Sequence, residues 1–449
     1  YIPGTDTCIK LGGYLRAEVG FNTSGASETP AWNGNSGQRN RLANDYQFRS
    51  RQDLTIDTRT ATEYGVVRTY FDSVFTWTTG SDGVAGGSLG MYFAFIQFAG
   101  FTMGKSVSMF STPWNGSPGN VGSNLLGGDD TSTGVNQIAY TAQFGNGVSA
   151  SISLEDQSQY RQSQGVSDVF NTTGLGATNT PATWLSGAGP GTSYVAGTSI
   201  PDIVGQVRVD QAWGLFQVSA AAHDIRASYY NPTNETSDHP GDKYGFAVLA
   251  ALSLKNLPTG AGDSLNLDAT YADGAIRYVI GGTSPNNFAM YGNTGIPGVY
   301  QSLAVGASPD GVFTTGGGIN TTKAWGVRGA FNHNWTPNWT TSVFGAYSSV
   351  DFGGTGGALY TAGLKAVLGG AAINTFTGTP NFNIAQIGTV TRWTPVKGLT
   401  FSGEVMYTML DQNYSGVTAP VSAGATKPAA VRYEFKDQNT WTGLVRAQR

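Results

Sequence analysis

One stretch near the start of the chain restricts the fold most, because its side chains sort into an apolar and a charged face. In residues 9–21 every second residue is apolar or glycine, and all charged residues fall on the positions between them. Successive side chains of a β-strand point to opposite faces, so the stretch is predicted to be a strand with one apolar wall. It is long enough to cross a bilayer, which takes about 9–11 tilted strand residues. The apolar wall could pack on a second sheet in a soluble sandwich or face lipid in a barrel.

The composition decides which kind of membrane crossing is possible. No apolar run approaches the roughly 18 residues of a membrane helix, so any crossing must be made by strands. The 449 residues include 64 glycines but only 12% charged residues, whereas ordinary domains carry about 7% glycine and about 25% charge. This bias is typical of many β-turns. The formal charge of −4 and the absence of a basic tract give no reason to expect a nucleic-acid partner.

The same two-residue alternation recurs along the whole chain and predicts about sixteen strands. Short turns and long polar loops alternate between them, as in membrane barrels, where the short turns are periplasmic and the longer loops external. We therefore predict an all-β fold, a sixteen-stranded antiparallel transmembrane β-barrel with long external loops, built as a single domain from residues 1–449. The predicted strands are 9–21, 46–59, 66–77, 91–99, 101–105, 135–144, 148–155, 203–213, 215–225, 244–254, 265–280, 323–335, 339–352, 382–394, 399–411 and 431–449.

Aromatic residues gather where the predicted strands end. Such positions are typical of the aromatic girdles at the two membrane interfaces. The alternative is that these rings are core residues flanking hairpins. The residues are Phe21, Trp77, Trp213, Trp335, Trp339, Trp393 and Trp441.

Three segments also carry a family resemblance: the opening PGTDTCIKLGGYLRAEV (3–19), AFIQFAGF (94–101) and the closing NTWTGLVRAQR (439–449). They resemble the first strand, the hairpin before the inward loop and the last strand of alphaproteobacterial porins of the Rhizobiales and Brucella type. The resemblance implies a bacterial outer-membrane location and a homotrimer of sixteen-stranded barrels. It also implies that the third long loop, residues 106–134, is folded into the lumen as a constriction.

The chain departs from that family at two places. Family members carry a second cysteine upstream of the position of Cys8, which is the only cysteine here. They also end in an aromatic residue, whereas this chain ends at Arg449. We expect a few residues to be missing at both ends and Cys8 to pair with an absent cysteine; the alternative is a buried free thiol.

Cations on the predicted inner face of the first three strands form the candidate positive side of a pore. So many cations on one face need water or carboxylates nearby, because unpaired buried charge is costly. A hydrated lumen would supply the water. The alternative is that the cations only hold the wall together by pairing with Glu18, Asp53, Asp57 and Asp72. The candidate pore-lining cations are Lys10, Arg16, Arg49, Arg51, Arg59 and Arg68.

The candidate negative side is the acidic pair Asp129 and Asp130 in the loop of residues 106–134. Facing cations across a lumen, the two carboxylates would produce a transverse field that sorts ions and orients dipolar solutes at a constriction. The alternative is that they lie at a solvated loop tip or cap a local turn.

No sequence motif predicts catalysis, a metal site or a cofactor. The three histidines are His223, His239 and His333, and none falls in a Ser/His/acid or Cys/His pattern. No HExxH, CxxC or phosphate-loop motif occurs. We therefore expect no enzyme and no cofactor.

The expected function is that of a general diffusion porin, which sits in outer-membrane lipid and passes small hydrophilic solutes and ions passively. A substrate-selective channel is the alternative; its lumen would need an aromatic track, and Tyr14, Tyr70 and Tyr140 are too scattered to predict one. An outer-membrane hydrolase would need His223 or His333 as an essential residue. A purely structural or adhesive protein would have a plugged lumen.

Overall fold

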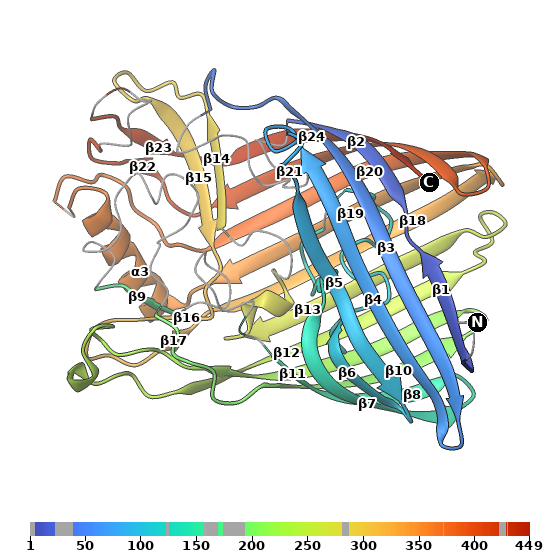
Figure 1. The fold of residues 1–449 in the computed structure, drawn as a ribbon. Coiled ribbons are helices and arrows are strands. Elements are labelled where there is room, and N and C mark those ends of the chain that lie inside the picture. The colour runs from blue at the N-terminus through green and yellow to red at the C-terminus, as the bar shows by residue number, and fades with distance from the viewer. Residues whose placement is uncertain are drawn as a thin grey trace.

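The computed structural model describes residues 5–22, 39–122, 125–156, 158, 169–173, 194–280, 287–370, 372–421, 428 and 430–449. Within them, one sheet of seventeen strand segments curls into a cylinder (Figure 1). The segments are β1 (Thr7–Gly12), β2 (Leu15–Phe21), β3 (Tyr46–Thr62), β4 (Gly65–Thr78), β5 (Ser88–Phe98), β6 (Phe101–Ser106), β7 (Val135–Gly145), β8 (Val148–Glu155), β10 (Asp202–Gln211), β11 (Gly214–Ile225), β12 (Lys243–Lys255), β13 (Ser264–Asp273), β18 (Lys323–Thr336), β19 (Trp339–Asp351), β20 (Phe382–Val396), β21 (Leu399–Gln412) and β24 (Gln438–Gln448).

The first two segments are parts of one broken strand, so the barrel has sixteen strands, as the sequence predicted. β1 and β2 pair with successive parts of β3. β2 also pairs with the last strand, β24, where Arg16 lies opposite Gln448. This pairing closes an antiparallel barrel. Both chain ends lie at the same end of the cylinder as the short turns (Figure 1).

The wall separates an apolar outside from a polar inside. Leu11 and Leu15 are 67% and 59% exposed, whereas Glu18 and Arg49 are 5% and 4% exposed. Directly opposite residues on neighbouring strands point to the same side, and Glu18 lies opposite both Arg49 and Arg446. The predicted pattern of an apolar outer face and a charged inner face is therefore confirmed.

The long loops gather at the other end of the barrel and contain helices and strands of their own (Figure 1). Their buried rings, such as Phe288, Phe376 and Tyr433, belong to an apolar cluster, which a two-residue alternation cannot reveal. Among the described residues, no helix is both long and apolar enough to span a membrane. The loop elements are β9 (Val169–Asn171), β14 (Asn287–Gly292), β15 (Gln301–Ala307), β16 (Gly311–Phe313), β17 (Asn320–Thr321), β22 (Gly416–Val417), β23 (Tyr433–Phe435), α3 (Gly354–Val367), η3 (Glu235–Ser237) and η4 (Ile276–Tyr278).

The predicted strand 265–280 was too long at its end. β13 stops at Asp273, and Gly274, with φ of 65°, turns the chain into the short 3-10 helix η4. The side chain of Asp310 fixes this turn, because its Oδ1 accepts a 2.7 Å hydrogen bond from Ile276 N. The apolar residues after Asp273 are therefore buried within the protein and do not extend the wall.

A second difference lies at Gly13, which interrupts the predicted strand 9–21. Its φ is 131°, and a Cβ at this position would lie 2.1 Å from the backbone oxygen of Asp53. Only glycine tolerates both this conformation and this close approach. The break lets Tyr14 O accept a 2.8 Å hydrogen bond from Asp53 N.

We expect Gly13→Ala to lower the free energy of unfolding by about 1–3 kcal/mol, because alanine would be strained there. Denaturant titration of the barrel in detergent measures this change. Gly205→Ala is the matched control, since Gly205 also lies in a wall strand and a Cβ there meets nothing within 4 Å. Equal unfolding midpoints for the two variants would contradict the close approach.

Candidate functional site

Residues 106–134 link β6 to β7 and cross the inside of the barrel. Inward side chains of β10, β11, β13, β20 and β21 bond to the backbone of this loop, which therefore lies in the lumen against that half of the wall. These hydrogen bonds join Gln206 Nε2 to Met109 O (2.7 Å), Gln217 Nε2 to Ser111 O (3.0 Å), Asn266 Nδ2 to Pro118 O (2.8 Å), Leu126 N to Gln386 Oε1 (3.0 Å) and Val121 N to Glu404 Oε2 (2.6 Å).

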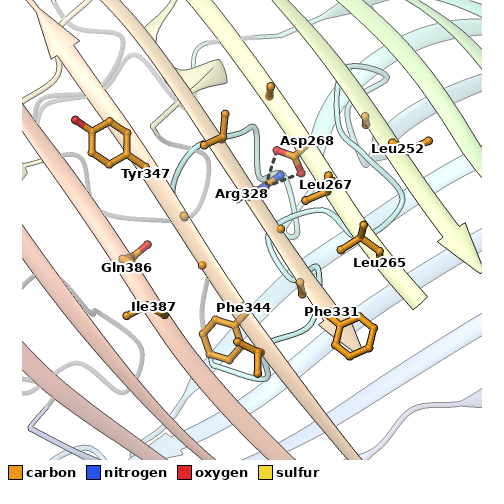
Figure 2. A pocket seen from close by; sticks show the side chains of 18 of the residues that line it. Leu252, Leu265, Leu267, Asp268, Arg328, Phe331, Phe344, Tyr347, Gln386 and Ile387 are labelled. Atoms are coloured by element: carbon orange, nitrogen blue, oxygen red, sulfur yellow. Dashed lines mark hydrogen bonds and ion pairs between the residues drawn. The ribbon is translucent and has the colours of Figure 1, made fainter. Parts of the chain in front are cut away.

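Every nitrogen of the Arg328 guanidinium group on β18 has a partner, and two of the three hold the loop. Nε lies 2.9 and 3.0 Å from the two carboxylate oxygens of Asp268 on β13, as Figure 2 shows. Nη1 donates to Leu125 O at 3.1 Å, and Nη2 donates to Asp129 O at 2.9 Å. Trp114 Nε1 of the loop donates to Asp268 Oδ2 at 2.7 Å. Both charged side chains are buried, and this full set of partners offsets their desolvation.

An apolar recess of about 710 Å³ lies on the outer face over this ion pair (Figure 2). It forms where Gly329 and Gly345 lie opposite each other without side chains. Leu267 and Ile387, which line it, are exposed on the lipid-facing side. The recess therefore belongs to the membrane-facing surface and not to the lumen.

The acidic pair predicted from the sequence lies on the inward loop with both side chains buried. Asp129 is 0% exposed. Its Oδ2 accepts a 2.6 Å hydrogen bond from Ser111 Oγ, and its Oδ1 lies 3.4 Å from Arg277 Nη1. Asp130 Oδ1 accepts a 2.9 Å hydrogen bond from Ser132 N, which is a local turn contact. A role of this pair at the constriction stays a prediction.

The six predicted cations share one face of β1 to β4, and several are paired there. Arg49 forms an ion pair with Glu18. Arg59 and Arg68 both pair with Asp57, at 3.4 and 3.0 Å, and the side chain of Arg59 is 60% exposed. Each of these three arginines therefore has a carboxylate partner in the wall, and their pore-lining role stays a prediction.

Lys10 and the two remaining arginines are placed differently. Lys10 is exposed and lies opposite Asp57. Arg16 and Arg51 lie directly opposite each other on β2 and β3, and both are partly exposed. Arg16 Nε donates to Gln448 Oε1 and Arg51 Nε donates to Thr76 Oγ1, each at 3.0 Å. The pore-lining role of these three cations stays a prediction.

The sequence reasoning missed a buried cluster around Arg277, in the turn after β13. Its Nη1 lies 3.4 Å from Asp129, its Nη2 lies 3.7 Å from Glu155, and its guanidinium carbon lies 4.0 Å from the centre of the Tyr278 ring. One sequence signal could have revealed this cluster: Arg277 is a lone arginine inside an apolar stretch. A cation that is buried in such a stretch needs a carboxylate partner. The cluster ties the inward loop to this turn.

The histidines flagged as possible catalytic residues make structural contacts. His223 Nδ1 lies 2.7 Å from Asp202 Oδ1 and its Nε2 lies 3.3 Å from Asp310 Oδ2, so both ring nitrogens are engaged in a buried site. His333 Nδ1 lies 2.7 Å from Asp263 Oδ2 beside the ring of Trp335. Among the described residues, no group of three or more acidic, histidine or cysteine side chains could hold a metal ion.

Cys8 is a free and exposed thiol on β1. The alternative of a buried thiol is therefore wrong. The other possibility, a disulfide with a cysteine outside this sequence, stays a prediction.

A closed barrel of sixteen antiparallel strands with a polar lumen narrowed by an inward loop defines the class of outer-membrane channels. The chain belongs to the porin family whose model is described as the porin subfamily, which matches residues 1–444. Its place is therefore the bacterial outer membrane, and it is a channel and not an enzyme.

Individual relatives agree with this family. Porin Omp2b of Brucella canis is 28% identical over 225 residues, which cover 48% of this chain and 51% of that porin. Porin Omp2b of Brucella abortus (strain 2308) is 29% identical over 223 residues, with the same shares. The alignments span about half the length of these relatives. The outer membrane channel DcaP of Acinetobacter baumannii has a similar fold, with a TM-score of 0.63 and 15% identity over 98% of this chain and 96% of that chain.

We expect Arg328→Met to lower the free energy of unfolding by about 3–5 kcal/mol, because buried Asp268 would lose its cation. The loop would also lose two backbone anchors, so single-channel conductance should rise. Lys323→Met is the control on the same strand: Lys323 is 55% exposed and lies 3.7 Å from Asp273, and such a pair contributes about 0–1 kcal/mol. Equal effects of the two variants on stability and conductance would refute the anchoring role.

Proposed function

We propose that this chain is a general diffusion porin that passes small hydrophilic solutes and ions passively across the outer membrane. Residues 1–449 form one channel domain, and residues 106–134 set its constriction. The alignments with curated porins and the family match support this activity.

The observation that carries the proposal is the one-sided attachment of the inward loop. The wall strands bonded to the loop run from β7 and β8 round to β21. On β2, β3 and β4, the inward-facing side chains of Arg16, Arg51 and Arg68 remain partly exposed. This asymmetry supports an open path between the loop and the wall of β2 to β5.

The charges along that path support a preference for anions. Exposed groups act on a passing ion more strongly than groups neutralised within a buried network. Arg16, Arg51 and Arg59 keep exposed surface, whereas Asp129 and Asp130 are buried. The field at the constriction is therefore dominated by the cationic side.

The double variant Arg16→Gln with Arg51→Gln tests this preference. We expect the chloride-to-potassium permeability ratio to fall roughly three- to tenfold, because a unit charge contributes about 1 kcal/mol to a nearby ion even in water. Reversal potentials in planar bilayers under a KCl gradient measure the ratio. Lys323→Gln removes a cation from the outer face and should leave the ratio unchanged. An unaltered ratio in the double variant would exclude these arginines from the path, and a channel that never conducts would refute the porin.

A homotrimer is the assembly that we infer, and the outer face of β3 and β4 supports a protein contact. Ser50 and Gln52 are exposed on the outer face of β3, and the hydroxyls of Thr58 and Thr69 bond to each other there. Polar side chains facing lipid are costly, so a neighbouring protomer suits this face better than acyl chains do. On β12, by contrast, the outward residues are Phe246, Val248, Ala250 and Leu252.

A bulky side chain on the outer face of β3 tests whether a neighbouring protomer or lipid covers this face. We expect Ser50→Trp to shift detergent-solubilised trimers to monomers, because the indole would protrude into the contact. Ala250→Trp is the matched control, since Ala250 is an exposed small residue on the outer face of β12. Light scattering gives the mass of each complex. A trimer that tolerates Ser50→Trp, or a monomeric wild type, would contradict the assembly.

A further inference from the structure

Guanidinium groups and aromatic rings alternate on the inner face of β2 to β5. We call this set the guanidinium–aromatic face; it consists of Tyr14, Arg16, Arg51, Arg68, Tyr70, Tyr92, Phe93 and Phe95. All of these side chains are partly exposed. The distances from guanidinium carbon to ring centre are 4.6 Å for Arg16 and Tyr14, 5.8 Å for Arg51 and Tyr92, 5.1 Å for Arg68 and Tyr70, and 5.6 Å for Arg68 and Phe95.

A β-bulge in β5 brings two successive rings to this face. Phe93 lies opposite Asp72 and Met91 lies opposite Ser73, so Tyr92 is the extra residue of the bulge. The ring centres of Tyr92 and Phe93 are 6.5 Å apart. Strict alternation would have sent one of these two rings to the lipid side.

Lys105 on β6 fixes the bulge in place. Its Nζ donates to Met91 O at 2.7 Å and to Tyr92 O at 3.2 Å. The same ammonium group donates to Thr133 O, at the end of the inward loop. The position of the rings is therefore set by a specific polar contact.

The position of Arg16 directly opposite Arg51 on the neighbouring strand points to an anionic ligand. Like charges directly opposite on neighbouring strands are destabilising, yet these two arginines face each other in register. Asp53 attracts both guanidinium groups but is only 4% exposed. Each arginine carries five N–H donors in a planar fork that matches a carboxylate. A passing carboxylate would be attracted by both guanidinium groups at once.

The guanidinium–aromatic face ends in a hollow at the short-turn end of the barrel. This hollow has a volume of about 750 Å³ and is lined by Arg59, Arg68 and Gln97, among others. Arg68 thus belongs to both the face and the hollow. A solute that follows the face leaves through a polar opening.

We propose that the guanidinium–aromatic face is a transport track for small carboxylates that carry an aromatic ring. The inference rests on the proposed diffusion through this lumen and names a solute class that the lumen favours. The carboxylate binds a guanidinium fork, and the ring stacks on the neighbouring tyrosine or phenylalanine. Repeated weak sites along a path allow a solute both to enter and to leave.

Other solutes use only half of this face. Inorganic anions and aliphatic carboxylates bind the arginines but gain nothing from the rings. Sugars contact the rings but gain nothing from the positive charge. Only an aromatic anion uses both at the spacing that Arg51 and Tyr92, or Arg68 and Tyr70, provide.

Benzoate and cyclohexanecarboxylate test the track, because they share charge and six-membered ring but differ in the π face. Reversal potentials of the full-length channel in planar bilayers give their permeability ratio. We expect wild type to prefer benzoate about two- to tenfold, the range that one stacking contact supports. The double variant Tyr70→Leu with Tyr92→Leu should lower the ratio toward one, because Tyr14 and Phe95 remain, and should keep the preference for chloride over potassium. Tyr140→Leu with Phe144→Leu, on the exposed outer face, should leave the ratio unchanged.

Block of the chloride current by each carboxylate gives a second measurement that needs no variant. Benzoate should reach half-maximal block at about a two- to tenfold lower concentration than cyclohexanecarboxylate. If benzoate and cyclohexanecarboxylate permeate and block wild type equally, the track is overturned, whereas the proposed porin function is not. A benzoate preference as large in the Tyr70 and Tyr92 double variant as in wild type would also overturn it. Absence of any ion current would instead refute the proposed function and, with it, the track.

Discussion

A lipid bilayer offers no hydrogen-bond partner to a peptide group, and the ladder between β2 and β24 is how this chain satisfies that constraint. Closure gives β2 a partner on each edge, β3 on one side and β24 on the other. It also gives every strand one face toward lipid and one toward the lumen, so the inner charges of Glu18, Arg49 and Arg446 can neutralise one another. The lumen and the inward loop both depend on this closed wall.

Inside that wall, charge pairing decides where the lumen stays open. The ion pair of Arg328 and Asp268 holds residues 106–134 against one half of the barrel, and the cluster around Arg277 fixes the loop from a second direction. On β2 and β3, Arg16 donates to Gln448 and Arg51 donates to Thr76, and both arginines keep exposed surface. The loop contacts Arg328 and Arg277, whereas Arg16 and Arg51 lie on the inner face of β2 and β3. The proposed path is positive for this reason.

Local periodicity was enough to predict the barrel, because each wall strand must alternate by itself to separate lipid from the lumen. It placed Arg16 and Arg51 on the inner face correctly. It could not predict the contacts of Arg277 or His223, whose partners are distant in sequence and lie in loops without periodicity. It also missed the clustering of aromatic rings in the lumen, because the bulge at Tyr92 breaks the alternation on which the prediction depends.

The ammonium group of Lys105 connects the bulge in β5 with the end of the inward loop. It bonds to the backbone of the bulge at Tyr92 and to Thr133 at the end of the inward loop. Grafting a different loop onto this barrel would therefore also reorient the rings on β5. In the proposed track, the loop that sets the aperture and the rings that favour a solute therefore share one ammonium group.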